Sequence, residues 1–497
     1  MADSISTTHP EYAEQLPDWQ LMRDAYKGQR RVKSRGDVYL PATPGQIADG
    51  FGRAGTQGQK DYDSYKLRAR FPGFVREAVQ MAVGMMHSQP AEISLPAAME
   101  GIMSSKGETL QQLLRRINEE QLLTGRIGVM ADIPTSPEVG KDLPYLTTYA
   151  AEKIINWDNG TAEGLVPQSL NLVVLNETEH ERKNIFDWEE EEKYRALFIG
   201  QLENNETAAV YRQGVFGDQD FNSDDLSTPA WRGTQLKEIP FVIINSCDLV
   251  VEPDEPPLLD LGNIVFTIYR GDADYRQNLF MQGQDTFVVI GGMFDESDSV
   301  RTGVGARIDL PLTGDAKYVG VESSGLSEQR ESLDNLEQRA GTMGAQTLDS
   351  TSRERESGDS MRIRVSARTA NLNQIADTGA AGLERVLKIV ARWIGENPDE
   401  VAVKANKEFG EAAISGQTMV EMQTARNLGF PISAGSLHAY AARNRLTVLT
   451  FDEEQAAAKS EESGSFARQE GGDRNPDQSG SNGTQDENGN GADTGEE

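Results

Sequence analysis

Residues 258–282 read LLDLGNIVFTIYRGDADYRQNLFMQ, directly after the proline-rich segment VVEPDEPP at 250–257. Apolar side chains recur in this stretch at three- and four-residue spacings, which is the pattern of an amphipathic helix. At 1.5 Å per residue the predicted helix is about 37 Å long. Its apolar face consists of Leu261, Ile264, Val265, Ile268, Tyr275 and Leu279.

The chain after this helix changes to short-strand patterning over residues 284–322, with QDTFVVIGG, ARIDLPL and AKYVGV separated by turns. A second helix is predicted from about Leu326 to Met343, with a narrow apolar stripe on an otherwise charged surface. That stripe is Leu326, Leu333, Leu336 and Ala340. Two helices of similar length that flank a small β unit in the sequence predict a helical hairpin with the strands at its end.

The next segment, GAQTLDSTSRERESGDS at 344–360, is small, polar and charged. A periodic segment from Met361 to Ile394 predicts a long helix, and we expect a kink at Gly379 and Gly382, because glycine weakens a helix interior by about 1 kcal/mol. Residues 398–459 predict a small helical unit with one helix capped by Ser433. Residues 460–497 carry 10 acidic and 2 basic side chains and few apolar ones, so we expect disorder there.

The chain before residue 250 mixes predicted helices and strands, so the fold class is α+β. Helices are predicted from Tyr65 to before Pro90 and over about 108–123; strands are predicted within 124–134, 144–157, 165–175, 187–200, 205–216 and 239–246. The basic cluster KGQRRVKSR at 27–35 is a solvated turn in one interpretation and a partner or nucleic-acid contact in the other. The run EEEE at 189–192 predicts a solvated edge or hairpin tip.

The composition narrows the function classes. The 497 residues suggest two to four structural units. There are 48 Lys and Arg against 79 Asp and Glu, a formal net charge of −31, which argues against binding nucleic acid by neutralising phosphates. Cys247 is the only cysteine, so no disulfide framework within the chain and no Cys-rich zinc site is expected. No apolar run of 18 or more residues and no signal-peptide pattern occurs, so we expect a soluble, intracellular protein.

Motifs for catalysis were sought and not found. The nearest match to a phosphate-binding loop, Gly55 to Lys60, has the wrong glycine spacing, and Gly303 to Ile308 does not complete a dinucleotide-binding pattern. The His180-Glu181 pair lacks the second histidine of a zinc-protease motif. We therefore expect no enzymatic activity, no metal and no cofactor.

Nine segments of the chain, taken in order, together carry a resemblance. They are HPEY (9–12), PDW (17–19), YLP (39–41), YDSYKLRARFPGFV (62–75), SLP (94–96), TGRIGVMADIP (124–134), PYLTTYAAEKIINW (144–157), PPLLDLGNIVFTIYRGDADYRQNLFMQGQDTFVVIGG (256–292) and ESGDSMRIRVSARTANLNQIA (356–376). The chain resembles one branch of the portal proteins of tailed bacteriophages over roughly residues 9–455. It departs from that branch at HSQP (87–90) and in its longer acidic tail.

The resemblance implies a dodecameric ring at one capsid vertex, through which double-stranded DNA passes during packaging and ejection. It implies a portal fold with a mixed wing, a two-helix stem, a small β clip and a helical crown. The corresponding ranges are an N-terminal arm (1–35), wing (36–257), first stem helix (258–283), clip (284–323), second stem helix (324–343), tunnel loop (344–357), kinked wing helix (358–396), crown (397–459) and disordered acidic tail (460–497).

The resemblance also implies partners. These are further copies of the chain, the large subunit of terminase, the head–tail adaptor, the major capsid protein and scaffold, and DNA that is not bound sequence-specifically; no membrane is involved. The expected location is the portal vertex of the virion, with assembly in the host cytoplasm. Implied site residues are a DNA-facing set, Ser350, Ser352, Arg353, Glu354, Arg355 and Glu356, and a stem-packing set, Leu261, Ile264, Val265, Ile268, Leu333 and Leu336. In the alternative interpretation, the alternating charges at 353–356 form a self-compensated polar loop.

Two other classes of function remain open at this point. Another virion structural protein, such as an adaptor or internal scaffold, would lack a β unit held between two helices and would not form a twelve-fold ring. An enzyme with a site outside the known motifs, such as an acidic hydrolase, would turn over substrate as a monomer or small oligomer.

Overall fold

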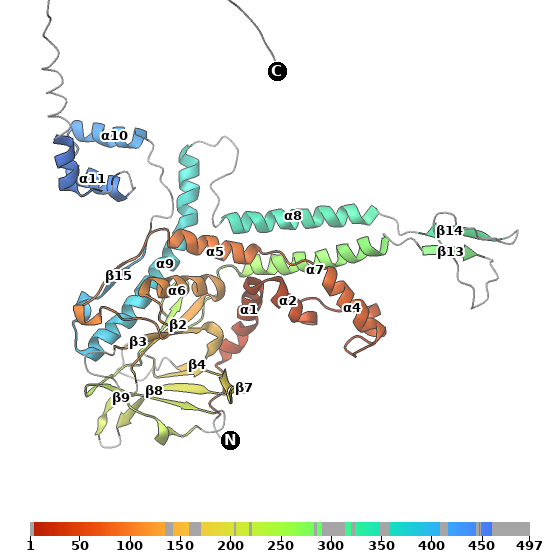
Figure 1. Ribbon diagram of the computed structural model, residues 1–497, viewed down its shortest axis with the longest axis horizontal. Coiled ribbons are helices and arrows are strands. Elements are labelled where there is room, and N and C mark those ends of the chain that lie inside the picture. The colour runs from red at the N-terminus through yellow and green to blue at the C-terminus, as the bar shows by residue number, and fades with distance from the viewer. Residues whose placement is uncertain are drawn as a thin grey trace, which may run out of the picture. The chain divides into compact units, whose positions relative to one another are not determined.

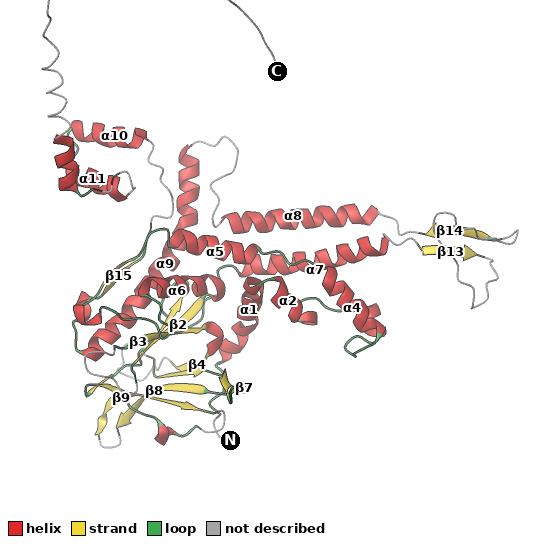
Figure 2. Ribbon diagram, in the orientation of Figure 1, coloured by secondary structure: helices red, strands yellow, loops and turns green. Residues whose placement is uncertain are grey.

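The computed structural model describes residues 4–134, 143–158, 170–202, 205–217, 221–282, 286–290, 314–319, 324–346, 358–407, 416–443, 447 and 449–459. The described chain mixes helices and strands (Figure 2), in agreement with the predicted α+β class. It divides into a first compact unit, Met1–Phe409, and a second, Gly410–Glu497. None of the described helices is long and apolar enough to cross a membrane.

The helices of the first unit run from one near the N-terminus to the long helices after residue 258 (Figure 1). The predicted helices at 258–282 and 326–343 are confirmed with slightly different ends. The helices are α1 (Pro10–Lys27), α2 (Gln29–Ser34), α3 (Pro44–Ala48), α4 (Gln57–Arg68), α5 (Phe74–Met86), α6 (Leu110–Thr124), α7 (Leu259–Gln282), α8 (Ser324–Gln346) and α9 (Gly358–Ile394).

The strands pair antiparallel throughout the described chain. A three-stranded sheet has the order β12 (Phe241–Asn245), β2 (Arg126–Asp132), β3 (Tyr145–Ala150). A four-stranded sheet has the order β4 (Ile154–Asp158), β5 (Leu172–Asn176), β8 (Tyr194–Leu202), β9 (Asn205–Phe216). The remaining pairs are β1 (Glu92–Ser94) with β15 (Ala402–Lys404), β6 (Glu179–Arg182) with β7 (Trp188–Glu191), β10 (Ala230–Trp231) with β11 (Thr234–Gln235), and β13 (Thr286–Ile290) with β14 (Asp315–Val319).

Two hydrophobic clusters hold the first unit together. The sheet cluster lies around the two larger sheets with α6 and the end of α9, and includes Val129, Leu197, Ile244 and Leu383. The helix cluster joins α5, α7 and α8, and includes Val79, Val265, Ile268 and Leu333. Helix α1 contributes to both, because Trp19 is fully buried in the sheet cluster and Met22 is fully buried in the helix cluster.

The basic segment 27–35 forms part of the packed structure. Residues 29–34 form α2, and the Nε atoms of Arg31 and Arg35 donate to the two carboxylate oxygens of buried Asp24 at 2.7 and 2.9 Å. The hydroxyl of Tyr39 donates to the same carboxylate at 2.9 Å. The segment is therefore a short helix rather than a turn, and Asp24 of α1 orients two of its arginines, while Lys27, Arg30 and Arg31 are exposed.

Helix α9 continues through the two glycines that predicted a kink. A Cβ at Gly382 would lie 2.5 Å from Cδ1 and Cγ1 of Ile244, and a Cβ at Gly379 would lie 2.4 Å from Nδ2 of Asn118. The two glycines therefore allow α9 to approach β12 and α6 more closely than any larger residue would permit.

The C-terminal boundary differs from the predicted start of the crown at residue 397. Strand β15 pairs with β1, with Val403 opposite Ile93, so residues 402–404 belong with the first unit. In the second unit, α10 (Gly416–Asn427) precedes α11 (Ala434–Arg443), and a further helix covers 451–459. The predicted cap is confirmed, because Ser433 Oγ accepts a hydrogen bond from the Ser436 amide at 3.0 Å.

Candidate functional site: the paired helices α7 and α8

Helices α7 and α8 lie side by side and run antiparallel, and the chain between them carries the β13–β14 pair (Figure 1). At 1.5 Å per residue, the 24 residues of α7 span about 36 Å. The helices come close at Gly271, where a Cβ would lie 3.0 Å from Cδ2 of Leu333. Of the predicted clip at 284–323, residues 286–290 and 314–319 are described, and they form the strand pair.

The six residues predicted for stem packing gather in the helix cluster. Leu261, Val265, Ile268 and Leu333 are buried, and Ile264 and Leu336 are partly buried against the same cluster. Their partners include side chains of α1, α4 and α5, such as Met22, Tyr65 and Val79. The α7 face therefore packs against the N-terminal helices as well as against α8.

Polar contacts fix the middle of α7 to α4 and the chain after it. The Tyr65 hydroxyl donates to Asp274 at 2.5 Å, and the Arg70 amide donates to Asp272 at 2.8 Å. Arg276 Nε donates to both oxygens of Asp272, at 2.9 and 2.7 Å. Burial, followed by the bond to Asp274, raises the pKa of the Tyr65 phenol, so this hydroxyl stays protonated and remains a donor.

These contacts were missed by the sequence analysis. Tyr65 with Asp274 and Arg70 with Asp272 are about 200 positions apart, so local sequence patterns cannot predict these contacts. The only available signal was the resemblance segment YDSYKLRARFPGFV, which was noted without a role for its polar side chains.

The outer surface of the helix pair is mainly polar and charged, with an apolar end. An open groove of about 500 Å³ runs between the helices and is lined by Thr267, Arg270, Gly271, Asp274, Gln329, Ser332, Leu333 and Leu336. Exposed charged side chains on α8 are Glu328, Arg330, Glu331, Asp334 and Arg339. Near the strand pair, α7 exposes Leu279, Phe280 and Met281, and the Arg68 guanidinium lies 3.7 Å from the Phe280 ring centre.

The predicted DNA-facing residues lie outside the described residues. Ser350, Ser352, Arg353, Glu354, Arg355 and Glu356 fall between the end of α8 at Gln346 and the start of α9 at Gly358. The predicted acidic tail at 460–497 also lies outside them.

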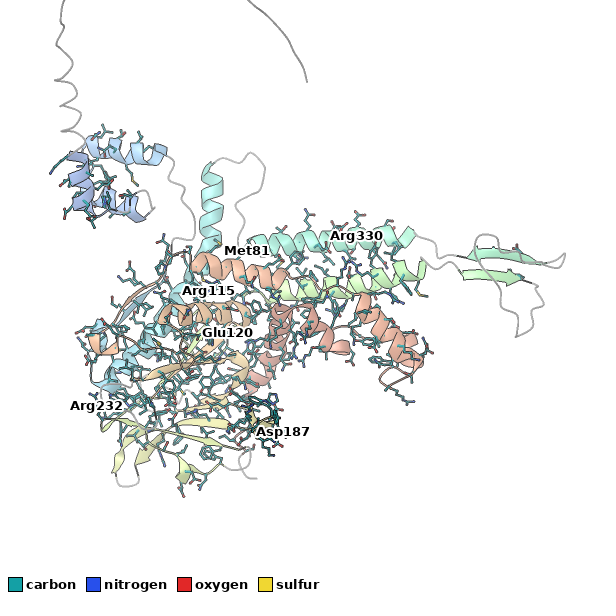
Figure 3. The ribbon with its side chains drawn as sticks, viewed as in Figure 1. Met81, Arg115, Glu120, Asp187, Arg232 and Arg330 are labelled. Atoms are coloured by element: carbon teal, nitrogen blue, oxygen red, sulfur yellow. The ribbon has the colours of Figure 1, made fainter. Side chains whose placement is uncertain are left out.

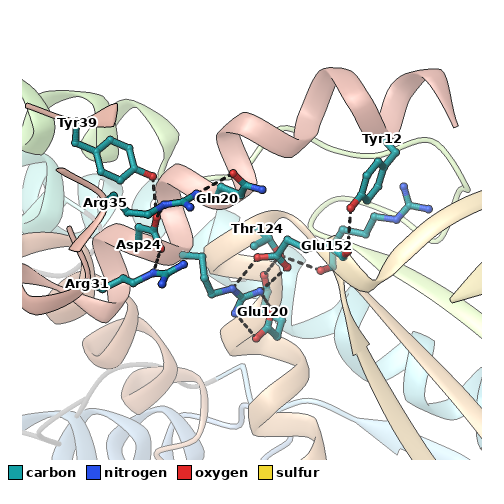
Figure 4. A network of polar contacts seen from close by, with 11 residues as sticks. Tyr12, Gln20, Asp24, Arg31, Arg35, Tyr39, Glu120, Thr124 and Glu152 are labelled. Carbon is teal, nitrogen blue, oxygen red and sulfur yellow. Dashed lines mark hydrogen bonds and ion pairs between the residues drawn. The ribbon is translucent and has the colours of Figure 1, made fainter. Parts of the chain in front are cut away.

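A second group of charged residues holds α1 against α6 (Figure 4). Arg23 donates to both oxygens of Glu120 at 2.7 Å and to both oxygens of Glu152 at 2.8 Å. Burial lowers the pKa of Arg23, but the two carboxylates outweigh burial and the net pKa is raised. Both carboxylates are committed to ion pairs, so this network is a structural clamp between α1, α6 and the segment after β3.

A polar cavity of about 870 Å³ lies beside this clamp. Its charged lining residues are Lys106, Arg116, Lys153, Lys193, Arg195, Glu119, Glu120, Glu177, Glu179 and Glu181. Many of these charges are paired, for example Arg195 with Glu177 at 2.8 Å. Among the described residues, no group of three or more His, Cys, Asp or Glu side chains could hold a metal ion.

Arg126 is the most unusual buried group of the described chain. Its side chain is fully buried, its three nitrogens have no hydrogen-bond partner, and its guanidinium lies 4.1 Å from the ring centre of Trp157. Burial lowers the pKa of Arg126 to about 9, against the opposing charges of Glu11, Glu252 and Asp254.

Comparisons with known proteins give a partial family match. Residues 257–394, which contain α7, the strand pair, α8 and all of α9, match the family described as "Domain of unknown function (DUF4055)". No curated protein matches the chain significantly.

Solved structures with similarity to the chain come from gene transfer agent particles. A chain of "Neck of native GTA particle computed with C12 symmetry" has 12% identity and a TM-score of 0.38, over 80% of this chain and 98% of that one. A chain of "Virion of native gene transfer agent (GTA) particle" has 11% identity and a TM-score of 0.39, over the same shares.

Proposed function

We propose that the chain is the subunit of a phage-type portal, a dodecameric ring in the capsid that conducts double-stranded DNA. In this proposal α7 and α8 are the stem, and the strand pair between them is the clip that meets the packaging terminase and later the head–tail adaptor. The observation that carries the proposal is the antiparallel pair of long helices that is rooted in a packed unit and bears a strand pair at its end.

The charge of the chain supports a conduit rather than a DNA-binding protein. A net charge of −31 disfavours lasting contact with phosphates, because each neutralised phosphate adds salt-dependent adhesion that would slow sliding DNA. The exposed charges of α8 include both signs, and Arg330 pairs with Asp334, which keeps this surface hydrated without making it strongly basic.

The proposal is tested by the mass and shape of the purified full-length chain. Light scattering should give a particle near twelve times 54.5 kDa, and negative-stain images of that fraction should show rings with an open centre. A short DNA duplex should not be retained at physiological salt. A discrete dimer or tetramer without a central hole, or a monomer at every concentration, would contradict the portal proposal.

The helix assignment is tested by a charge on the packed face. Ile268→Asp introduces a carboxylate into the helix cluster, so we expect loss of rings and a lower melting temperature. Asn263→Asp, on the exposed side of the same helix, is the matched control and should leave both unchanged. Normal rings from the Ile268 variant would show that this face does not hold the stem.

A further inference from the structure

The β6–β7 hairpin exposes an apolar tip. Ile185, Phe186 and Trp188 are 70%, 90% and 59% exposed. Hydrogen bonds hold the backbone of the tip, because the amides of Phe186 and Asp187 donate to the Asn184 side chain at 2.9 and 3.0 Å. Figure 3 shows Asp187 at the margin of the strand region. Exposed apolar side chains on a hydrogen-bonded turn are characteristic of a contact surface, because little backbone freedom is lost when they are covered.

The strands behind this tip are strongly acidic. Residues 177–193, which we call the acidic hairpin, contain eight Asp and Glu and three Lys and Arg. Two of its cations are used inside it, because Lys183 pairs with Glu189 and Lys193 pairs with Glu181. Glu190 and Glu192 are exposed and have no ion pair among the described residues.

An oppositely charged surface lies in the N-terminal helices. Residues 27–76, which we call the basic face, contain eleven Lys and Arg and four Asp and Glu, in a chain whose net charge is −31. Val38, Ile47 and Leu67 are 60–76% exposed on it. Lys33 Nζ donates to the Leu67 carbonyl at 2.9 Å, which ties α2 to the end of α4 within this region.

We propose that the acidic hairpin of one chain docks on the basic face of a second copy, with its apolar tip against the exposed apolar side chains there. The two surfaces are opposite in charge, and each carries apolar side chains that are exposed in the described part of the chain. A closed ring needs such a head-to-tail contact, in which every subunit presents two different surfaces. The inference rests on the proposed ring and adds the residues that pair its neighbours.

Charge reversal on each side tests the contact. We expect Glu190→Lys with Glu192→Lys to raise the subunit concentration at half-assembly by about tenfold or more. Lys27→Glu with Arg30→Glu should have the same effect, because both side chains are exposed on the basic face. The matched control, Asp399→Lys with Glu400→Lys, makes the same charge change at another exposed site and should assemble like the wild type.

Mixing separates pairing between copies from damage to the fold. In an equimolar mixture of the hairpin variant and the basic-face variant, each reversed hairpin can meet a reversed face on its neighbour, so alternating rings should re-form. Recovery in the mixture supports the proposal. If each variant alone forms rings as well as the wild type does, the docking proposal is overturned while the proposed function stands.

Two further outcomes also count against the contact. If the basic-face variant assembles normally but no longer binds a DNA duplex that the wild type binds, the basic face binds nucleic acid and the docking proposal fails. If the wild type forms no rings under any condition, the proposed function fails and the inference built on it fails as well.

Discussion

Replacing Gly382 by alanine distinguishes two roles for the glycines of α9. A glycine that only weakens the helix would gain about 1 kcal/mol of stability from alanine. The added Cβ would instead lie 2.5 Å from two carbons of Ile244 and 3.1 Å from a third. Ile244 is fully buried in the middle of the sheet cluster, so relieving this overlap should cost about 2–3 kcal/mol. The net expectation is a loss of about 1–2 kcal/mol.

The assay is urea unfolding followed by tryptophan fluorescence, with Trp157 and Trp393 reporting on the sheet cluster. Gly84→Ala is the matched control, because nothing lies within 4 Å of a Cβ at that exposed position of α5. It should gain about 0.5–1 kcal/mol. Ile244→Val removes Cδ1 and should recover about 0.5–1 kcal/mol of the Gly382→Ala loss in a double-mutant cycle. Equal gains in stability from both alanine variants would refute the close-packing argument.

Three further substitutions test the buried polar groups. Asp24→Asn should lower the free energy of urea unfolding by about 2–3 kcal/mol, because Arg31, Arg35 and Tyr39 lose a shared anion. The control Asp63→Asn, at an exposed position, should change that free energy by less than about 0.5 kcal/mol. Arg126→Met should stabilise the chain by about 1–4 kcal/mol below pH 9, and the difference should shrink above pH 9, where the native arginine begins to lose its proton. A destabilised variant would show that the contact with Trp157 outweighs the cost of burying the charge. Burial lowers the pKa of His87, so the unfolded chain binds a proton there more readily than the folded chain, and the wild type should lose stability as the pH falls through 6.5. His87→Gln should make stability less dependent on pH in that range. If wild type and variant show the same dependence of stability on pH, His87 is not its source.

Periodicity predicted the long elements well. Helix α7 begins one residue after the predicted start and ends at the predicted Gln282, and the predicted strand at 205–216 is β9 residue for residue. Helix α7 repeats its apolar spacing over many residues, and burial of one face follows directly from such a repeat, whereas β9 does not alternate strictly, since neighbouring Val210 and Tyr211 are both buried.

The elements that the sequence analysis missed depend on distant partners. Helix α1 has an irregular apolar pattern and Pro17 in its interior, and it is held by Arg23, whose partners Glu120 and Glu152 lie 97 and 129 positions away. Strand β15 is only three residues long and exists because β1 lies beside it. The role of Gly382 depends on Ile244, which lies well over 100 residues before it, so only the packed structure distinguishes close approach from a weak helix.

The sharing of α1 between two clusters has a consequence for synthesis of the chain. Residues 10–27 leave the ribosome long before the segments that cover them, because Met22 packs with helices that begin at Leu259, and the sheet cluster around Trp19 is complete only when α9 has been made. Until then, the apolar side chains of α1 lack their partners for most of translation, the period in which a nascent chain is most prone to aggregate. Much of the first unit must therefore fold after the ribosome has passed residue 394, and a slower ribosome would lengthen the exposed interval rather than help.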